Sequence, residues 1–245
     1  MHQNTRRRIG LIGHGRIGRA VANALVAGQA GAWELAAVLT RSPAKVFSAL
    51  HHCNPVAFFS VAADLYIECA GPEAMALHGE EALQRADVWS VSGVALADDA
   101  LRTRLEAIGA RCGHRLRLVA GAAGGLDALQ AMAVDANLTV DVAIVTPERC
   151  EPLCTTVREA AVRLPHSVNL AVAIALAGPG MDRTTIRVTP DPENSHHAIS
   201  LAARSAYGSF HANLEPITDA SKDLHIVAAS LIAALRQASS VIWVG

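Results

Sequence analysis

Residues 8–18 read RIGLIGHGRIG and decide the fold of the first half of the chain. A short apolar run, 8–12, is followed at once by glycines with the spacing Gly-x-Gly-x-x-Gly. Beyond them, apolar residues recur at helical spacing, namely Ile17, Ala20, Val21, Ala24 and Leu25. A further apolar run at 33–39 follows this helix. The order of strand, glycine turn, helix and strand predicts a βαβ unit.

Each glycine of this turn has its own role in binding a dinucleotide. The first permits a tight turn, the second lets the backbone approach a pyrophosphate, and the third lets the helix pack on the strand. The phosphates would lie at the helix N-terminus, where free N–H groups and the helix dipole favour anions. The alternative is a turn that serves packing alone. We predict a site for NAD or NADP made by Gly13, His14, Gly15, Arg16, Ile17 and Gly18.

The second predicted strand ends at Leu39-Thr40-Arg41-Ser42, a sequence that bears on the choice between NAD and NADP. Sites that prefer NAD usually carry Asp or Glu here to hold the ribose 2′-hydroxyl, and this chain has neither. Arg41 has the charge to pair with a 2′-phosphate, and Thr40 can hydrogen-bond it. We therefore predict that NADP is accepted; the alternative is an Arg41 that only faces solvent.

The rest of the first half continues the alternation of strands and helices. Apolar runs at 64–69, 88–92 and 117–120 alternate with helical patterns at 72–86 and 98–110. This order predicts a parallel sheet with right-handed crossovers. Small residues follow two of the strands, where the nicotinamide half of a dinucleotide usually lies. We assign Ala70, Gly71 and Ser92 to the cofactor, and residues 1–121 to a Rossmann-type dinucleotide-binding domain.

The pattern changes after Gly121, and we predict an α+β catalytic domain with a mostly antiparallel sheet over residues 122–220. The whole chain is thus predicted to be α/β, with a Rossmann domain followed by this second domain. We expect the final helix, within 221–245, to pack back on the first domain. The expected helices of the second domain are 128–134, 155–164 and 168–176, and its expected strands are 139–145, 184–189, 198–203 and 205–212.

Composition restricts the class of protein. The 245 residues are 51% hydrophobic and carry a net charge of −1, so no overall field favours nucleic acid or an anionic membrane. The five cysteines show no CxxC pair and no metal-ligand spacing, which fits a reducing compartment and predicts no metal site. No secretory leader and no apolar run of membrane-spanning length is visible. We predict a cytoplasmic protein.

Candidate chemical groups lie in the second half. Histidine titrates near neutral pH and can exchange a proton with an amine or a hydroxyl, which makes His196 and His197 candidates. Adjacent side chains on a strand face opposite ways, so one of the two can point into a cleft; the alternative is that both lie on a surface loop. The run 121–125 offers N–H groups to a carboxylate or cofactor, or is a plain hinge. Asn169, in an otherwise apolar helix, is expected to have a specific partner, either a ligand or a structural one.

Taken together, these pieces resemble the L-aspartate dehydrogenase family, in family order and over most of the chain. The resemblance is carried by GHGRIG (13–18), ECAGPEA (68–74), VSGVALADDAL (91–101), GAAGGLDAL (121–129), LPHSVNLAVAIALAG (164–178), MDRTTIRVTPDP (181–192) and the Asn194-x-His196 element. The chain departs from the family at His166-Ser167, where a Lys-Asn pair is common.

The resemblance implies that L-aspartate is oxidised to iminoaspartate with NAD or NADP. The imine then hydrolyses to oxaloacetate and ammonia, or feeds NAD biosynthesis. The family's catalytic histidine falls on His196, and its cofactor contacts fall on Ala122 and Asn169. We expect a homodimer that binds L-aspartate or a similar dicarboxylate, with no nucleic-acid or membrane partner. To the substrate we assign Ala123, Gly124 and Asn194.

Two other classes of protein share parts of this pattern. A reductase of the dihydrodipicolinate reductase or homoserine dehydrogenase type has the same two-domain plan. It would normally show a Lys or a His-rich signature in the second domain, which we do not find. A non-catalytic sensor that binds the dinucleotide would need a module for a partner or for DNA, and none precedes the glycine turn.

Overall fold

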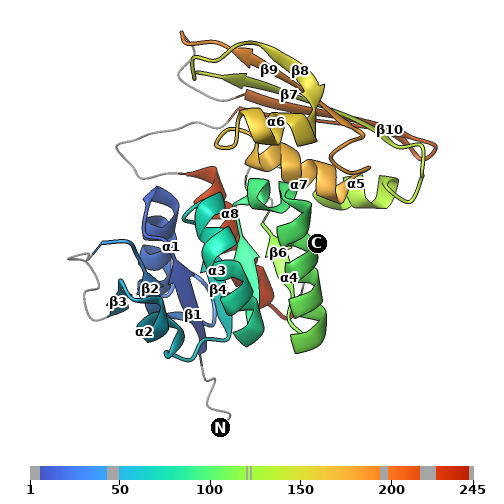
Figure 1. The fold of residues 1–245 in the computed structure, drawn as a ribbon. Coiled ribbons are helices and arrows are strands. Elements are labelled where there is room, and N and C mark those ends of the chain that lie inside the picture. Colours follow the sequence, from blue (N-terminus) through green and yellow to red (C-terminus); the bar gives the residue numbers. More distant parts are fainter. Residues whose placement is uncertain are drawn as a thin grey trace. The chain divides into compact units, whose positions relative to one another are not determined.

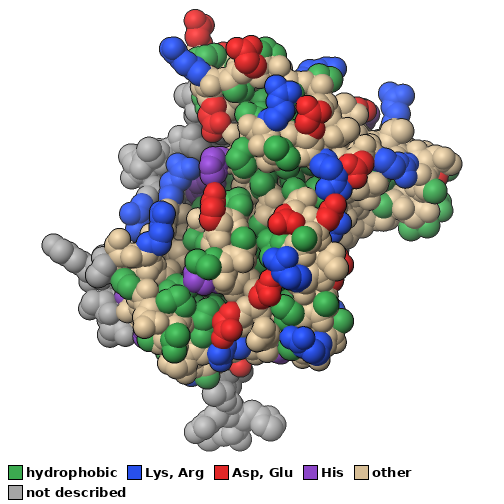
Figure 2. All heavy atoms as spheres, viewed as in Figure 1, with side chains coloured by type: hydrophobic (Ala, Val, Ile, Leu, Met, Phe, Trp, Pro, Cys, Tyr) green, Lys and Arg blue, Asp and Glu red, His purple; other side chains and the backbone are tan. Residues whose placement is uncertain are grey.

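The computed structural model describes residues 6–42, 50–119, 121, 123–193, 198–215 and 225–242. The chain divides into two compact units, one formed by 1–121 with 221–245 and the other by 122–220. Within the described residues, none of the helices has the length and apolarity needed to cross a membrane. Figure 2 shows cationic and anionic side chains intermixed over much of the face in view, in keeping with a net charge of −1.

The first unit is built on a six-stranded sheet in which every pairing is parallel, with the order β3-β2-β1-β4-β5-β6. Because β1 lies between β2 and β4, the chain reverses its direction of winding there, and the carboxyl ends of these strands open a crevice. The strands are β1 (Arg7–Ile12), β2 (Trp33–Leu39), β3 (His51–His52), β4 (Leu65–Glu68), β5 (Asp87–Ser90) and β6 (Leu116–Leu118).

Helices cover both faces of this sheet (Figure 1). They are α1 (Arg16–Val26), α2 (Pro55–Phe59), α3 (Pro72–Arg85), α4 (Asp99–Cys112) and α8 (Ile226–Ala238), with a 3₁₀ helix at Gly93–Ala97. One core cluster joins α1 and α8 to one face through Leu25, Leu231 and Leu235. The other cluster includes Phe58 and Leu105. The strands are buried on both sides, which explains why they read as continuous apolar runs.

Helix α8 comes from the end of the chain and is hydrogen-bonded to residues of β1 and β2. The indole N–H of Trp33 donates to the carbonyl of Leu235 at 3.1 Å, and the guanidinium of Arg7 donates to the carbonyl of Ala238 at 2.7 Å. Arg7 also lies over the Trp33 ring, 3.9 Å from its centroid. The first and last parts of the chain therefore share one core.

The second unit has a mixed sheet of order β11-β10-β7-β9-β8, in which β7 and β9 are parallel and the other pairs antiparallel. Figure 1 shows the helices of this unit on one side of the sheet. The predictions of a parallel first sheet and a mostly antiparallel second sheet are confirmed. The elements are α5 (Leu126–Met132), β7 (Thr139–Thr146), β8 (Leu153–Thr156), α6 (Val157–Arg163), α7 (Asn169–Ala177), β9 (Thr184–Pro190), β10 (Ala198–Ser205) and β11 (Gly208–Leu214).

One predicted helix begins later than expected. The helix expected over 155–164 covers only Val157–Arg163, because Thr155 and Thr156 belong to strand β8 and pair with β9. Thr156 then caps α6, since its hydroxyl accepts the N–H of Glu159 at 3.3 Å. A β-branched residue with a hydroxyl suits both tasks, the end of a strand and the N-cap of a helix.

Candidate functional site

The glycine turn lies where β1 ends, beside the ends of β2 and β4. Gly13 has φ +101°, and a Cβ added there would lie 2.7 Å from the Cβ of Ala70 and 2.9 Å from its Cα. The N–H of Gly13 donates to the carbonyl of Leu39 at 2.9 Å. The first glycine is therefore enclosed between two strand ends, and no side chain fits at this position.

The other two glycines differ in what surrounds them. A Cβ at Gly18 would lie 2.3 Å from the carbonyl oxygen of Gly13, so α1 reaches the turn only with glycine there. Gly15 is exposed, and its Cβ would meet no described atom within 4 Å. Helix α1 begins just after Gly15, with no side-chain cap and no acidic residue in its first turn. The N–H groups and the dipole at this helix start favour an anion, which is consistent with the predicted pyrophosphate site.

The end of β2 carries the two residues predicted to contact the 2′ position. The hydroxyl of Thr40 donates to the carbonyl of Ser42 at 2.7 Å, and its backbone N–H donates to the carbonyl of His52 at 3.0 Å. The Thr40 hydroxyl proton is thus used within the turn. Arg41 is exposed and forms no ion pair within the part of the chain that the structure describes. Arg41 is therefore the side chain at this strand end that could form an ion pair with a 2′-phosphate.

The Arg41→Ala variant is expected to raise the Michaelis constant for NADP about tenfold and to leave that for NAD within about twofold, because only NADP carries the extra phosphate. The measurement is a pair of cofactor titrations at fixed, low ionic strength. Arg111→Ala, at an exposed position of α4, controls for the loss of a surface charge. Equal effects of Arg41→Ala on the two cofactors would contradict this role.

The predicted cofactor residues after β4 and β5 are brought together by a carboxylate that sequence reasoning missed. Glu68 ends β4, is fully buried, and accepts the N–H groups of Ala70 and Gly71 at 2.7 and 2.9 Å. Its other oxygen accepts the Ser90 hydroxyl at 2.6 Å, and the Ser90 oxygen accepts the N–H of Ser92 at 3.0 Å. The available signal was a single acidic residue at the end of a buried apolar strand.

Two histidine rings lie beside the glycine turn. The rings of His14 and His51 meet edge to face with centroids 4.8 Å apart, and burial lowers the pKa of both. The ring nitrogens of His51 are shielded from solvent and have no hydrogen-bond partner in the described structure. Buried polar atoms are normally satisfied, so an ordered water or a bound ligand would be expected to pair with these nitrogens. The sequence pattern predicts no strand or helix over 51–60, so it gave no sign of this contact.

In the second unit, two predicted substrate residues line a small cavity. Ala123 and Gly124 border a space of about 110 Å³ together with aliphatic side chains of α7, β10 and β11 and the amide of Asn213. Asn169 is half-buried and begins α7, next to the cavity residue Leu170. This lining is mainly apolar, so it does not by itself supply the cations or several donors that two carboxylates need.

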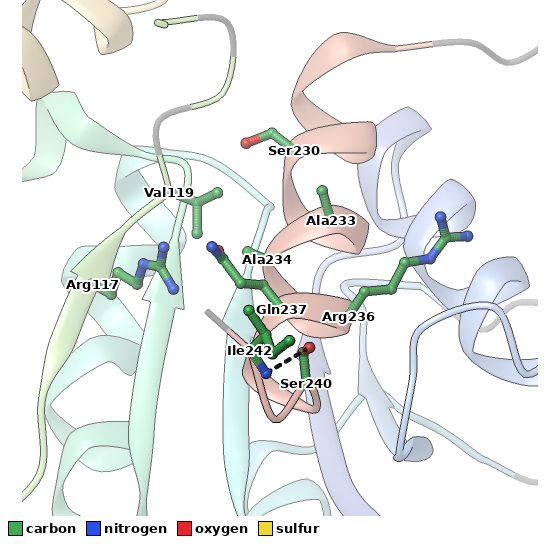
Figure 3. Close-up of a pocket in the computed structure, with 9 residues that line it drawn as sticks. All are labelled: Arg117, Val119, Ser230, Ala233, Ala234, Arg236, Gln237, Ser240 and Ile242. Carbon is green, nitrogen blue, oxygen red and sulfur yellow. Dashed lines mark hydrogen bonds between the residues drawn. The ribbon is translucent and has the colours of Figure 1, made fainter. Parts of the chain in front are cut away.

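Three predicted residues lie outside the described part of the chain, and their roles stay predictions: Ala122, Asn194 and His196. A larger pocket of about 630 Å³ between β6 and α8 contains none of the predicted site residues (Figure 3). The Arg117 guanidinium at this pocket lies over the Trp89 ring, 5.0 Å from its centroid. Among the described residues, no His, Cys, Asp and Glu side chains group in the way a metal ion requires.

Known proteins similar to this chain cover both units. Residues 13–119 match the family model described as the NAD binding domain of homoserine dehydrogenase, and residues 154–238 match aspartate dehydrogenase, C-terminal. L-aspartate dehydrogenase 1 of Bordetella pertussis is 35% identical, over 93% of this chain and 95% of that protein. L-aspartate dehydrogenase of Ruegeria pomeroyi is 32% identical, over 98% of this chain and 95% of that protein.

The fold is also that of a solved member of this group. The crystal structure of aspartate dehydrogenase from Thermotoga maritima superposes with a TM-score of 0.79, covering 98% of this chain and 99% of that one at 22% identity. The resemblance inferred from the sequence is confirmed by the curated relatives, which match nearly the whole chain. This chain belongs to the L-aspartate dehydrogenase family.

Proposed function

We propose that this protein is an NAD(P)-dependent L-aspartate dehydrogenase that converts L-aspartate into iminoaspartate, which water hydrolyses to oxaloacetate and ammonia. The observation that carries the proposal is the match of named L-aspartate dehydrogenases over 93% or more of the chain. Because the match spans both units, it does not depend on the nucleotide-binding half, which many dehydrogenases share.

The alternative of a homoserine dehydrogenase or a related reductase has less support. The homoserine dehydrogenase model covers only 13–119, which is the cofactor half of the chain. The second half, where a substrate is chosen, matches the aspartate dehydrogenase C-terminal model instead. Function follows the site rather than the shared cofactor domain, so this division favours L-aspartate.

The residues of the first unit hold and orient the cofactor. The N–H groups at the start of α1 bind the pyrophosphate, and Gly15 leaves room for it. The turn of Ala70 and Gly71 and the N–H of Ser92 border the position of the nicotinamide half. Bound NAD or NADP supplies the hydride acceptor for the reaction.

The proton chemistry is assigned to His196. Oxidation of L-aspartate removes a hydride from Cα and a proton from nitrogen, which leaves a C=N bond. A neutral imidazole at His196 takes a proton from the substrate ammonium or, in the alternative role, activates the water that attacks the imine carbon. Ala123, Gly124 and Asn194 are proposed to contact the substrate, and Ala122 and Asn169 the cofactor. A homodimer and a cytoplasmic location complete the proposal.

A substrate panel tests this function. Purified protein is mixed with NAD or NADP and with L-aspartate, L-alanine, L-glutamate or L-homoserine, and the absorbance of the reduced cofactor is followed. We expect reduction with L-aspartate, with ammonia and oxaloacetate formed in equal amounts. Reduction with L-homoserine alone, or with none of the amino acids despite tight cofactor binding, would contradict the proposal.

A further inference from the structure

Glu68 is a buried carboxylate whose surroundings call for an explanation. It is 0% exposed, and within the described residues no Lys, Arg or His pairs with it. Burial raises the pKa of its carboxyl group above the usual range, although hydrogen bonds from Ser90 and neighbouring groups act in the opposite direction. A well-packed apolar side chain would serve stability at least as well at a buried strand end. The carboxylate therefore has a task other than filling the core.

Its hydrogen bonds converge on one short segment. One oxygen accepts the N–H groups of both Ala70 and Gly71, and the other accepts the Ser90 hydroxyl. The side chain of Ser92 also hydrogen-bonds the carboxylate. Glu68 and Ser90 are paired neighbours in β4 and β5, so the carboxylate connects the turn after β4 to the end of the next strand. The segment held in this way is Ala70–Gly71, which passes directly into α3.

The same segment is fitted closely to the glycine turn. A side chain at Gly13 is excluded by the backbone and Cβ of Ala70, with separations of 2.7–2.9 Å. The thiol of Cys69 donates to the carbonyls of Ile12 and Gly13 at 3.5 and 3.6 Å. The Ala70–Gly71 segment that Glu68 holds thus lies directly against the first glycine of the glycine turn.

We propose that Glu68, with Ser90, is a positioning residue that fixes the Ala70–Gly71 turn against the glycine turn, so that the nicotinamide half of the cofactor is held in one place. The inference rests on the proposed function, in that it assumes a bound NAD or NADP. It assigns Glu68 no contact with the cofactor and no proton transfer. In either protonation state, the oxygen that faces Ala70 and Gly71 accepts their N–H groups.

Three substitutions distinguish this positioning role from a contribution to the stability of the fold alone. Glu68→Gln keeps an oxygen for the N–H groups of Ala70 and Gly71 and presents an NH₂ group to the Ser90 oxygen, so it should preserve the turn. Glu68→Ala removes both carboxylate oxygens, and Ser90→Ala removes the hydrogen bond to Glu68 together with the one accepted from the N–H of Ser92. Leu105→Ala is the matched control, because it removes buried volume from a core of the same unit without touching the turn.

The experiment measures the binding of NADH and NADPH by fluorescence. Binding of ADP-ribose, which lacks the nicotinamide, is measured by calorimetry, and thermal unfolding is recorded for each variant. Glu68→Ala should weaken binding of the reduced cofactors about tenfold or more, since the part-buried N–H groups of Ala70 and Gly71 lose the acceptor that orders their turn, and change ADP-ribose binding by less than about twofold. Glu68→Gln should restore cofactor binding. Ser90→Ala should also weaken NADH and NADPH binding more than ADP-ribose binding, but by a smaller factor. It replaces Glu68→Ala in the test if that variant does not fold. Leu105→Ala should lower the unfolding temperature and leave both affinities unchanged.

Other results would overturn the inference. Equal weakening of NADH and ADP-ribose binding in Glu68→Ala and Ser90→Ala would show a general defect of the domain. Unchanged NADH binding in both variants would show that the turn does not need these hydrogen bonds. Failure of Glu68→Gln to restore binding would also exclude this role. A wild-type protein that binds NADH but does not oxidise L-aspartate contradicts the proposed function and leaves this test intact. One that binds neither reduced cofactor overturns both.

Discussion

Replacing Gly18 with alanine is expected to lower the free energy of unfolding by roughly 1–3 kcal/mol, the usual cost of overpacking, and to weaken binding of NAD and NADP at least about tenfold. The added Cβ would stand 2.3 Å from the carbonyl oxygen of Gly13, an atom of the backbone that has no flexible side chain to move away. Helix α1 must therefore shift away from the turn, and its N-terminal N–H groups shift with it. Thermal unfolding and NADH titration measure the two effects.

Gly15→Ala is the matched variant for this prediction. Its Cβ meets no described atom within 4 Å, and its φ of −72° and ψ of −162° are open to alanine. Loss of a glycine N-cap and reduced freedom of the unfolded chain act in opposite directions, so stability should stay within about 1 kcal/mol. Cofactor affinity should still fall about tenfold, because the methyl group enters the space that the pyrophosphate needs. Wild-type affinity in both variants would contradict this account of the turn.

Replacing His196 with alanine is expected to reduce kcat for L-aspartate oxidation by roughly 10²- to 10⁴-fold, the range for loss of a general acid or base. Cofactor affinity should not change, because His196 is assigned to the proton chemistry and not to a cofactor contact. The measurement is steady-state turnover with saturating cofactor, combined with NADH titration.

His197→Ala is the control for this assignment, because the two histidines are adjacent and chemically equivalent. We expect it to keep most of the wild-type turnover. A large loss in His197→Ala with little loss in His196→Ala would move the catalytic role by one residue. Unchanged turnover in both variants would remove histidine from the proton chemistry and leave the family assignment as it is.

The strands and helices of the first unit could be predicted well because local pattern and fold agree there. The glycine turn at 13–18 separates a buried strand from an amphipathic helix, and the following apolar runs correspond to β2, β4 and β5. Parallel strands buried on both faces give a strong signal in a single sequence. The short elements β3 and α2 were missed, since a two-residue strand leaves no periodicity to detect.

The candidate site could be predicted only where it is made of backbone. Glycines and small residues mark a close approach of main chain to a ligand, which explains why Gly13, Gly15 and Gly18 stand out in the sequence. The buried network of Glu68 and Ser90 depends on which side chains meet across β4 and β5, and residue spacing along one strand does not encode this. The contact between His14 and His51 is equally non-local, since it joins the glycine turn to a strand nearly forty residues later.

The central claim, that this protein moves a hydride from Cα of L-aspartate to a nicotinamide, is tested most directly by isotope transfer. L-aspartate deuterated at Cα is incubated with the enzyme and oxidised cofactor. The reduced cofactor is then isolated and its mass is measured by mass spectrometry. The account predicts that each reduced cofactor carries the deuterium, and that the label is absent from oxaloacetate. Reduced cofactor without deuterium, or no reduced cofactor at all, would contradict it.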